Sequence, residues 1–218
     1  MDHTKKLIFI FFIFFSLITT NVFAGNRDFQ AKEGFYIGLS YENNSLPGEF
    51  DDSSYYTSAT YGYNVPDVDS GSGFGITFGS RLQKGAAELS YHRSNHDTDT
   101  QFIDIGKQDS TYNLVDINLK IDVFDQGKLK PNILLGLGYS WLNIDNSMTD
   151  GIHYSDETFT GFAGNLGTGL TYYFNPRLCI NGEVIYRWQS YGHIEGEEID
   201  ENIGGGGINY TVGIAYTF

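Results

Sequence analysis

Large apolar residues occupy every second position in eight separate stretches of the chain. In the last stretch, from Ile208 to Phe218, the residues between them are small or polar. Alternation with a period of two is typical of a β-strand whose two faces meet different surroundings. The other seven stretches begin near residues 35, 74, 87, 115, 133, 162 and 178. Since no sustained helical period follows the first two dozen residues, we predict an all-β protein with eight strands.

Short and long links alternate between the predicted strands. The short links are rich in Gly, Pro, Asn and Asp, as tight turns are, and cover residues 83–85, 125–131 and 175–177. The long links are polar, are expected to contain little strand, and lie near residues 43–72, 94–111, 143–160 and 189–207. Short turns at one end and long loops at the other indicate an antiparallel up-and-down barrel.

The positions between the large apolar residues carry many charged side chains, namely Arg81, Glu88, Asp116, Lys120, Asp122, Glu183 and Arg187. In a soluble barrel the apolar face would form the core and these charges would face water. In an outer-membrane barrel the apolar face meets lipid and the charges line the lumen. Because an eight-stranded barrel has room only for its own interior side chains, we expect the charges to pair into a plug. Arg81 and Glu88, which flank the turn at 83–85, are expected to pair with each other.

Aromatic residues favour the membrane alternative, because they gather near both ends of the predicted strands while Ile, Leu and Val fill the middle. Aromatic rings prefer the level of the lipid head groups, so this arrangement is typical of the two girdles of a membrane barrel. We assign to the girdles Phe35, Tyr41, Tyr139, Trp141, Tyr172, Phe174, Tyr186 and Trp188. The predicted fold is therefore an eight-stranded antiparallel up-and-down transmembrane β-barrel with short periplasmic turns and long extracellular loops.

The N-terminus has the features of a secretory signal. Lys5 and Lys6 precede the apolar run 7–19, and a small-residue cleavage site ends at Ala24. The alternative, a retained membrane anchor, is less favoured because the apolar run is short for a bilayer span. We expect residues 1–24 to be a signal peptide, 25–33 a short periplasmic segment and 34–218 the barrel.

The C-terminal half contains three stretches that suggest a family: "KPNILLGLGYSW", "NLGTGLTYYFNPRLCINGEVIYRW" and "NYTVGIAYTF". From about residue 34 onward, and most clearly from 131, the chain resembles the opacity-protein-like, OmpA-type family of eight-stranded outer-membrane barrels. The resemblance implies location in the outer membrane and closure of the last strand against the first. It also implies that the β-barrel assembly machinery reads the terminal strand through Tyr210, Val212, Ile214, Tyr216 and Phe218.

Charge and cysteine content narrow the partners. The formal net charge is −14, which makes the chain a poor binder of nucleic acid. The single cysteine, Cys179, rules out an internal disulfide and is expected to be a small buried residue. We expect a monomer in contact with outer-membrane lipid and lipopolysaccharide, and no cofactor.

The predicted loops are acidic and rich in tyrosine, and a host or surface ligand is a candidate partner for them. Their acidic runs have two interpretations, a solvated surface or a bridge through divalent cations to lipopolysaccharide phosphates. Residues 145–151 lack the ligand spacing of a calcium loop, so no defined metal site is predicted. We therefore expect a non-enzymatic surface antigen or adhesin, or a protein that maintains envelope integrity.

Two alternatives to this function remain, a narrow solute channel and an enzyme on the same barrel. "HRSN" (92–95) resembles a stretch of the outer-membrane lipid A deacylases, and His92 and Ser94 lie on one face of a predicted strand as a base and nucleophile would. The stretch lies early in the chain, its phase points into the lumen, and no matching glutamate follows on the next strand. We therefore expect His92 to be a residue of the barrel rim and the protein not to be an enzyme.

Overall fold

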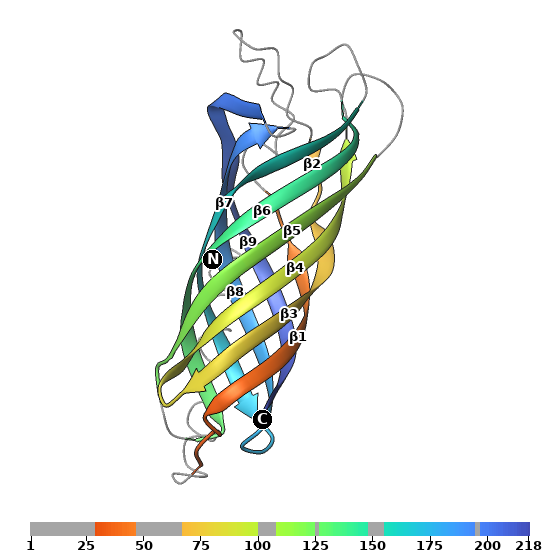
Figure 1. The fold of residues 1–218 in the computed structure, drawn as a ribbon. Coiled ribbons are helices and arrows are strands. Elements are labelled where there is room, and N and C mark those ends of the chain that lie inside the picture. Colours follow the sequence, from red (N-terminus) through yellow and green to blue (C-terminus); the bar gives the residue numbers. More distant parts are fainter. Residues whose placement is uncertain (1–28, 47–66, 100–107, 125–126, 148–154, 195–196) are drawn as a thin grey trace, which may run out of the picture.

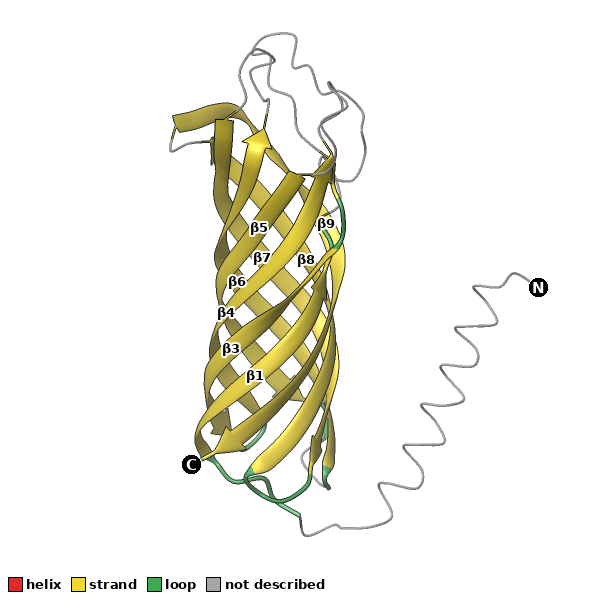
Figure 2. Ribbon diagram, turned by 90° about the vertical axis from the view of Figure 1, so that its right-hand side faces the viewer, coloured by secondary structure: helices red, strands yellow, loops and turns green. Residues whose placement is uncertain are grey.

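The computed structural model describes residues 29–46, 67–99, 108–124, 127–147, 155–194 and 197–218, which form a tall β-barrel (Figures 1 and 2). Its strands are β1 (Gly34–Asn44), β2 (Asp67–Val68), β3 (Gly71–Leu82), β4 (Gly85–Asp99), β5 (Gln108–Asp122), β6 (Leu129–Ser147), β7 (Ser155–Tyr173), β8 (Leu178–Ile194) and β9 (Glu197–Thr217). No helix in these ranges is long and apolar enough to cross a membrane.

The strands form one closed antiparallel sheet. The order is β2-β4-β3-β1-β9-β8-β7-β6-β5, and pairing of β4 with β5 completes the ring. The first and last strands meet from Tyr36 opposite Thr217 to Asn43 opposite Tyr210. Because β2 has two residues and only extends the upper part of the wall beside β4, the barrel has eight full strands. The predicted fold class and the predicted closure are confirmed.

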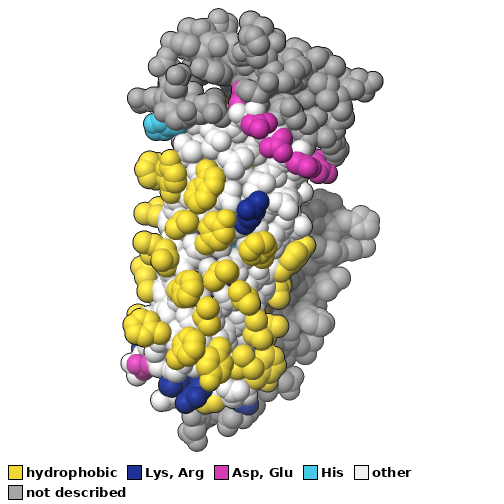
Figure 3. All heavy atoms as spheres, turned by 45° about the vertical axis from the view of Figure 1, so that its right-hand side comes forward, with side chains coloured by type: hydrophobic (Ala, Val, Ile, Leu, Met, Phe, Trp, Pro, Cys, Tyr) yellow, Lys and Arg dark blue, Asp and Glu magenta, His cyan; other side chains and the backbone are white. Residues whose placement is uncertain are grey.

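The two faces of the wall are as the alternation predicts. In β5, Ile117 and Leu119 are 63% and 54% exposed on the outside, whereas Asp116 and Asn118 are 1% and 4% exposed in the interior. The same holds around the barrel, so the outer surface carries an apolar belt (Figure 3). The interior therefore holds the charged residues of the minor face.

The three short turns lie together at one end of the barrel. One of them contains Gly127, whose φ of +89° is a conformation that only glycine adopts without steric strain. The N-terminal segment lies at the same end, where the Lys32 N–H donates to the Pro176 carbonyl at 2.8 Å and the Phe29 ring packs on Tyr173. This end corresponds to the predicted periplasmic side.

The long links contain much more strand than expected, and that prediction is wrong for three of the four. β4 and β5 extend through most of 94–111, β6 and β7 through most of 143–160, and β8 and β9 leave only 195–196 between them. Inward-facing side chains in these segments are buried although the outward-facing ones are polar: Ile144, Phe159, Tyr191 and Ile203 are apolar, whereas Ser94, His96, Thr98 and Ser110 are polar. Residues 1–28, 47–66, 100–107 and 148–154, which include the predicted signal peptide and the tips of three loops, lie outside the described residues.

Candidate functional site

The lower half of the lumen is centred on Lys120 of β5. Its Nζ lies 2.9 Å from Glu88 Oε1 on β4 and 2.5 Å from Glu183 Oε1 on β8. The Tyr36 hydroxyl donates to Glu88, and Asn181 Nδ2 donates to Glu183 at 3.0 Å. One buried cation therefore neutralises two buried carboxylates from different strands, as the predicted plug requires.

Arg81 has a different partner from the one expected. Its guanidinium binds Asp122, which also lies 3.7 Å from Lys130 Nζ, and it stacks over the Tyr173 ring. Glu88 is instead held by the lysine from the neighbouring strand. The predicted pairing of Arg81 with Glu88 is therefore wrong. The reason is that β5 supplies each of them with an oppositely charged partner, Asp122 for Arg81 and Lys120 for Glu88, and the sequence alone did not show this.

The middle of the lumen is organised around His92. Its Nδ1 lies 2.9 Å from Glu42, and its Nε2 lies 3.7 Å from Asp116. His92 is only 6% exposed, so the expectation that it lies at the rim is wrong. The physical reason is that β4 continues for seven residues beyond His92, which leaves the ring well inside the barrel.

Arg187 joins the same network through an amide. Its Nε donates to Asn165 Oδ1 at 2.9 Å, and Asn165 Nδ2 donates to Asp116 at 2.7 Å. All seven predicted lumen charges are therefore interior and part of polar networks. Sequence reasoning missed Glu42, Lys130 and the central position of His92, although their phase on the strands would have placed each of them inside.

A cavity of about 70 Å³ remains among these side chains, lined by Tyr36, Glu88, Lys120 and Thr217 among others. Cys179, buried as expected, is also part of its wall. A water molecule needs roughly 10–15 Å³ of such volume, so the cavity has room for a few waters. A volume of this size differs from the continuous path that a pore needs.

The upper lumen is apolar, which the sequence analysis did not predict. Its side chains form one buried cluster, the upper core, made of Leu46, Val68, Tyr112, Leu114, Leu142, Ile144, Phe159, Ala163, Tyr191 and Ile203. Six of them are 0% exposed, and the Phe159 and Tyr191 rings pack edge to face at 6.3 Å. The upper core fills the lumen beneath the loop end of the barrel.

A second polar group borders the upper core. Ser94 Oγ lies 2.9 Å from His96 Nε2, and His96 Nδ1 lies 2.8 Å from the Asp69 carbonyl. A carbonyl only accepts, so Nδ1 carries the hydrogen and Nε2 accepts from Ser94. His96 lies above the apolar belt, and its burial lowers the pKa of the imidazole. Ser94 and His96 are arranged like a nucleophile and its base, so His96 takes the role of base that the sequence analysis considered for His92.

Ser94 and His96 could act as nucleophile and base only if a substrate could reach them. Ser94 and His96 are 1% and 3% exposed, and Asn44 Nδ2 also donates to Ser94 Oγ at 3.1 Å. The serine hydroxyl therefore donates to His96 and accepts from Asn44 inside the barrel, and its burial keeps a substrate from it in this arrangement. In the described part of the chain, no three His, Cys, Asp or Glu residues are grouped as a metal site requires.

The predicted girdle and terminal-strand residues all lie on the outer surface. Tyr172, Phe174, Tyr216 and Phe218 form edge-to-face pairs at the short-turn end, and Tyr139 packs on Phe162 near the other end. The Phe218 N–H donates to the Phe35 carbonyl at 2.9 Å, so the final residue is part of the closing ladder. Whether assembly machinery reads this strand stays a prediction.

Comparison with known proteins agrees with this geometry. The sequence model of a family described as "Outer membrane protein beta-barrel domain" matches residues 10–218. The crystal structure of Neisserial surface protein A is similar at 17% identity and a TM-score of 0.52, covering 85% of this chain and 97% of that one. At this identity the likeness concerns the fold alone.

Two further structures have lower scores. Ail, the attachment invasion locus protein of Yersinia pestis, is 15% identical with a TM-score of 0.46, over 87% of this chain and all of that one. The N-terminal β-barrel domain of Pseudomonas aeruginosa OprF is 16% identical with a TM-score of 0.44, over 86% and 100%. A search of curated proteins finds no match.

Proposed function

The chain belongs to the outer membrane protein beta-barrel domain family and lies in the outer membrane, and from this premise we propose that it is a non-conducting, non-enzymatic anchor for its surface loops. The loops would act in recognition, as those of a surface antigen or adhesin do, with a contribution to envelope integrity from the barrel itself. Residues 1–24 are proposed to be removed on export.

The observation that carries the proposal is the two-part filling of the lumen. The lower half is occupied by paired charges and the upper half by the upper core. An ion moving through the barrel would have to displace apolar side chains such as Tyr112, Leu142 and Phe159, all 0% exposed. Buried apolar packing of this kind is costly to open, which disfavours the narrow-channel alternative.

The enzyme alternative is disfavoured by the same burial. Ser94 faces the interior, is enclosed by Asn44 and His96, and lies on the opposite side of the wall from lipid. His92, the residue that resembled a deacylase base, is held between two carboxylates instead. The geometry therefore supports a structural role for both histidines.

The composition of the loops supports a recognition role. The 43–72 segment contains four tyrosines together with aspartate, serine and asparagine. Tyrosine provides a large amphipathic contact surface at low cost in side-chain entropy, which is why binding loops are rich in it. Loops on a rigid barrel are a common arrangement for binding residues.

One purified, refolded sample tests the barrel part of the proposal. We expect no stable open current in planar lipid bilayers and no change in the mass of lipid A after incubation. A stable current would establish a channel, and loss of an acyl chain from lipid A would establish an enzyme. Either result contradicts the proposal.

Adherence of cells tests the loop part. A non-adherent Gram-negative host expressing the protein should bind to epithelial cells or extracellular matrix. Replacing residues 47–66 by a Gly/Ser linker should abolish binding, whereas replacing residues 125–127 at the opposite end should leave it unchanged. Equal adherence of the linker variant and the unaltered protein would refute a role for this loop.

A further inference from the structure

The outer surface changes its chemistry in successive rows toward the loop end. Across β1 and β3–β7, the register aligns the uppermost apolar row as Leu39, Ile76, Tyr91, Val115, Tyr139 and Phe162. The next row contains Tyr41, Phe74, Arg93, Asn113, Trp141 and Thr160. The chemistry therefore changes within one row from apolar to mixed aromatic and polar, and a cation first appears there.

The row above that, the amide–hydroxyl row, contains only amide and hydroxyl side chains, Asn43, Ser72, Asn95, Thr111, Asn143 and Thr158. Above it, Asp97 pairs with Asp109 across β4 and β5, and Asp145 and Asp156 each lie two residues from the amide–hydroxyl row toward the loop end of β6 and β7. All four aspartates are exposed. Figure 3 shows acidic side chains above the apolar belt.

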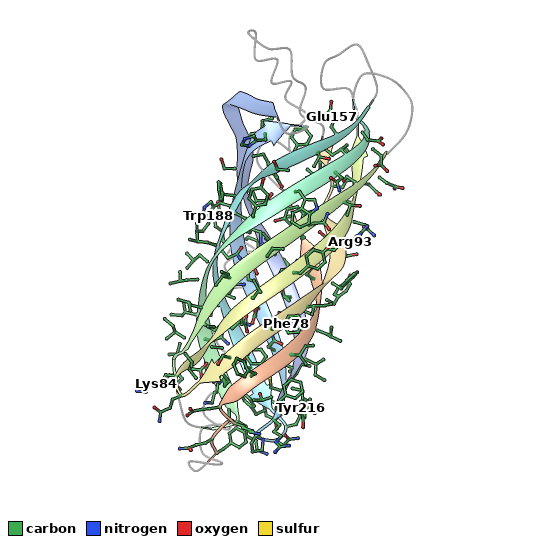
Figure 4. All side chains as sticks on the ribbon, viewed as in Figure 1. Phe78, Lys84, Arg93, Glu157, Trp188 and Tyr216 are labelled. Atoms are coloured by element: carbon green, nitrogen blue, oxygen red, sulfur yellow. The ribbon has the colours of Figure 1, made fainter. Side chains whose placement is uncertain are left out.

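Arg93 stands out within these rows. It is exposed on the outer side of β4 (Figure 4), in register with Phe74 on one side and Asn113 on the other. The other described lysines and arginines lie in the lumen or at the short-turn end, and no described carboxylate forms an ion pair with Arg93. An unpaired guanidinium at the upper edge of an apolar belt presents up to five N–H donors to the head-group region.

We infer that this face of β3–β7 binds a phosphorylated glucosamine lipid of the outer leaflet, of the lipid A type, with Arg93 on a phosphate. The acyl chains would lie on the apolar rows, and the sugar amides and hydroxyls on the amide–hydroxyl row. The inference rests on the outer-membrane location and is independent of what the loops recognise.

The charges on β4 limit where the phosphate lies. Arg93 attracts it, while Asp97, four residues and so roughly 13 Å further along the strand, repels it. An anionic group is therefore held at the level of Arg93 or just above it, opposite Asn95. A guanidinium offers bidentate, charge-assisted hydrogen bonds to phosphate, which gives the contact both strength and orientation.

The amide–hydroxyl row favours a glycolipid over a glycerophospholipid. A glycerophospholipid would present a single phosphate and a small head group, which do not need a row of hydrogen-bonding side chains across six strands. The Thr158 hydroxyl donates to Asn143 Oδ1 at 3.0 Å, which orients this amide. Sugars are recognised by such fixed amides and hydroxyls.

Trp141 provides an internal reporter for the test. It lies in the row of Arg93, two strands away and so roughly 10 Å across the sheet. The chain has two tryptophans, so a Trp188→Phe barrel reports from Trp141 alone. This barrel is refolded in detergent micelles, bisphosphorylated lipid A is titrated in, and the apparent dissociation constant is measured from the emission.

The expected result is saturable binding that Arg93→Ala weakens about tenfold, the effect of losing one charge-assisted contact, and that Arg93→Lys weakens less because it keeps the charge but loses the bidentate geometry. Arg177→Ala, at an exposed site on the opposite end, is the matched control and should leave the affinity unchanged. Heat-dependent gel mobility confirms that each variant is folded.

Three outcomes would overturn the inference. The first is equal affinity of the Arg93→Ala and Arg177→Ala barrels. The second is unchanged binding of lipid A whose phosphates have been removed. The third is displacement of lipid A by millimolar inorganic phosphate, which would indicate a site for the free ion. None of these results bears on conductance or cell adherence, so failure here is distinguishable from failure of the proposed function.

Discussion

Replacing Lys120 with methionine removes one charge from the lower lumen while keeping most of the side-chain volume. The ammonium lies 2.9 Å from Glu88 and 2.5 Å from Glu183, and the side chains of these carboxylates are only 6% exposed. After the substitution Glu88 keeps the Tyr36 hydroxyl and Glu183 keeps Asn181, but neither keeps a cation. Removing one partner of a buried ion pair typically costs 3–5 kcal/mol, so we expect the free energy of unfolding to fall by about that amount.

The cost should be recovered when the orphaned charges are removed as well. A triple variant, Lys120→Met with Glu88→Gln and Glu183→Gln, leaves neutral amides that still bond their neighbours, and most of the loss should disappear. Urea unfolding of barrels in lipid vesicles, followed by tryptophan emission, measures both changes. Lys84→Met, at an exposed turn position, is the control and should stay within about 0.5 kcal/mol of the parent. If Lys120→Met is no more harmful than this control, or the triple variant shows no recovery, the lumen charges do not act as a paired network.

Three further predictions concern the belt, the upper core and the terminus. Ile117 faces lipid at 63% exposure, so Ile117→Arg should lower the free energy of unfolding by about 2–4 kcal/mol. Asn118 faces the lumen, so Asn118→Arg should respond differently to bilayer thickness. Equal refolding of both variants into thin and thick lipids would contradict the assignment of faces. Leu142→Ala removes a fully buried side chain, so the free energy of unfolding should fall by about 2–5 kcal/mol in a urea titration. Phe218→Ser should reduce outer-membrane yield in cells more than refolding into detergent, because the exposed ring contributes at most about 1.5–3 kcal/mol of burial; equal losses in both assays would mean that the residue is only part of the wall.

Much of the architecture could be predicted because lipid and lumen impose opposite demands on neighbouring residues. The alternation of Ile117 and Asn118 placed one outside and one inside, and the same logic placed all eight strands and all seven lumen charges. Pairing was harder to predict. The partner of Arg81 depends on which strand supplies the nearest carboxylate, and Asp122 is 41 residues away in the chain.

The height of the barrel could not be predicted from a search for outward apolar residues, because that pattern stops where the outer surface leaves the apolar belt. His92 illustrates the consequence, since it was expected at the rim of a barrel whose wall continues to Asp99. The Ser94–His96 relay was missed for the same reason. His96 lies in a segment that was expected to be a loop, yet its even-numbered phase is that of Glu88 and His92, which are buried.

The upper core shows that the hydrophobic phase of the strands reverses along their length. On β5 the interior positions change from Asp116 to Leu114, while the exterior positions change from Val115 to Thr111. On β6 the interior changes from Ser140, the register partner of Leu114, to Leu142, the register partner of Tyr112, so the reversals on neighbouring strands lie within one interior position of each other.

A reversal at neighbouring positions of adjacent strands has a physical cause. Below it, lipid covers the outside and the interior must hold the polar groups; above it, water covers the outside and the barrel needs a core of its own, as a soluble barrel does. The point of reversal therefore marks the outer edge of the membrane in the sequence itself. Arg93, in register with Asn113 between Val115 and Thr111, lies at this edge, which is where an outer-leaflet phosphate is found.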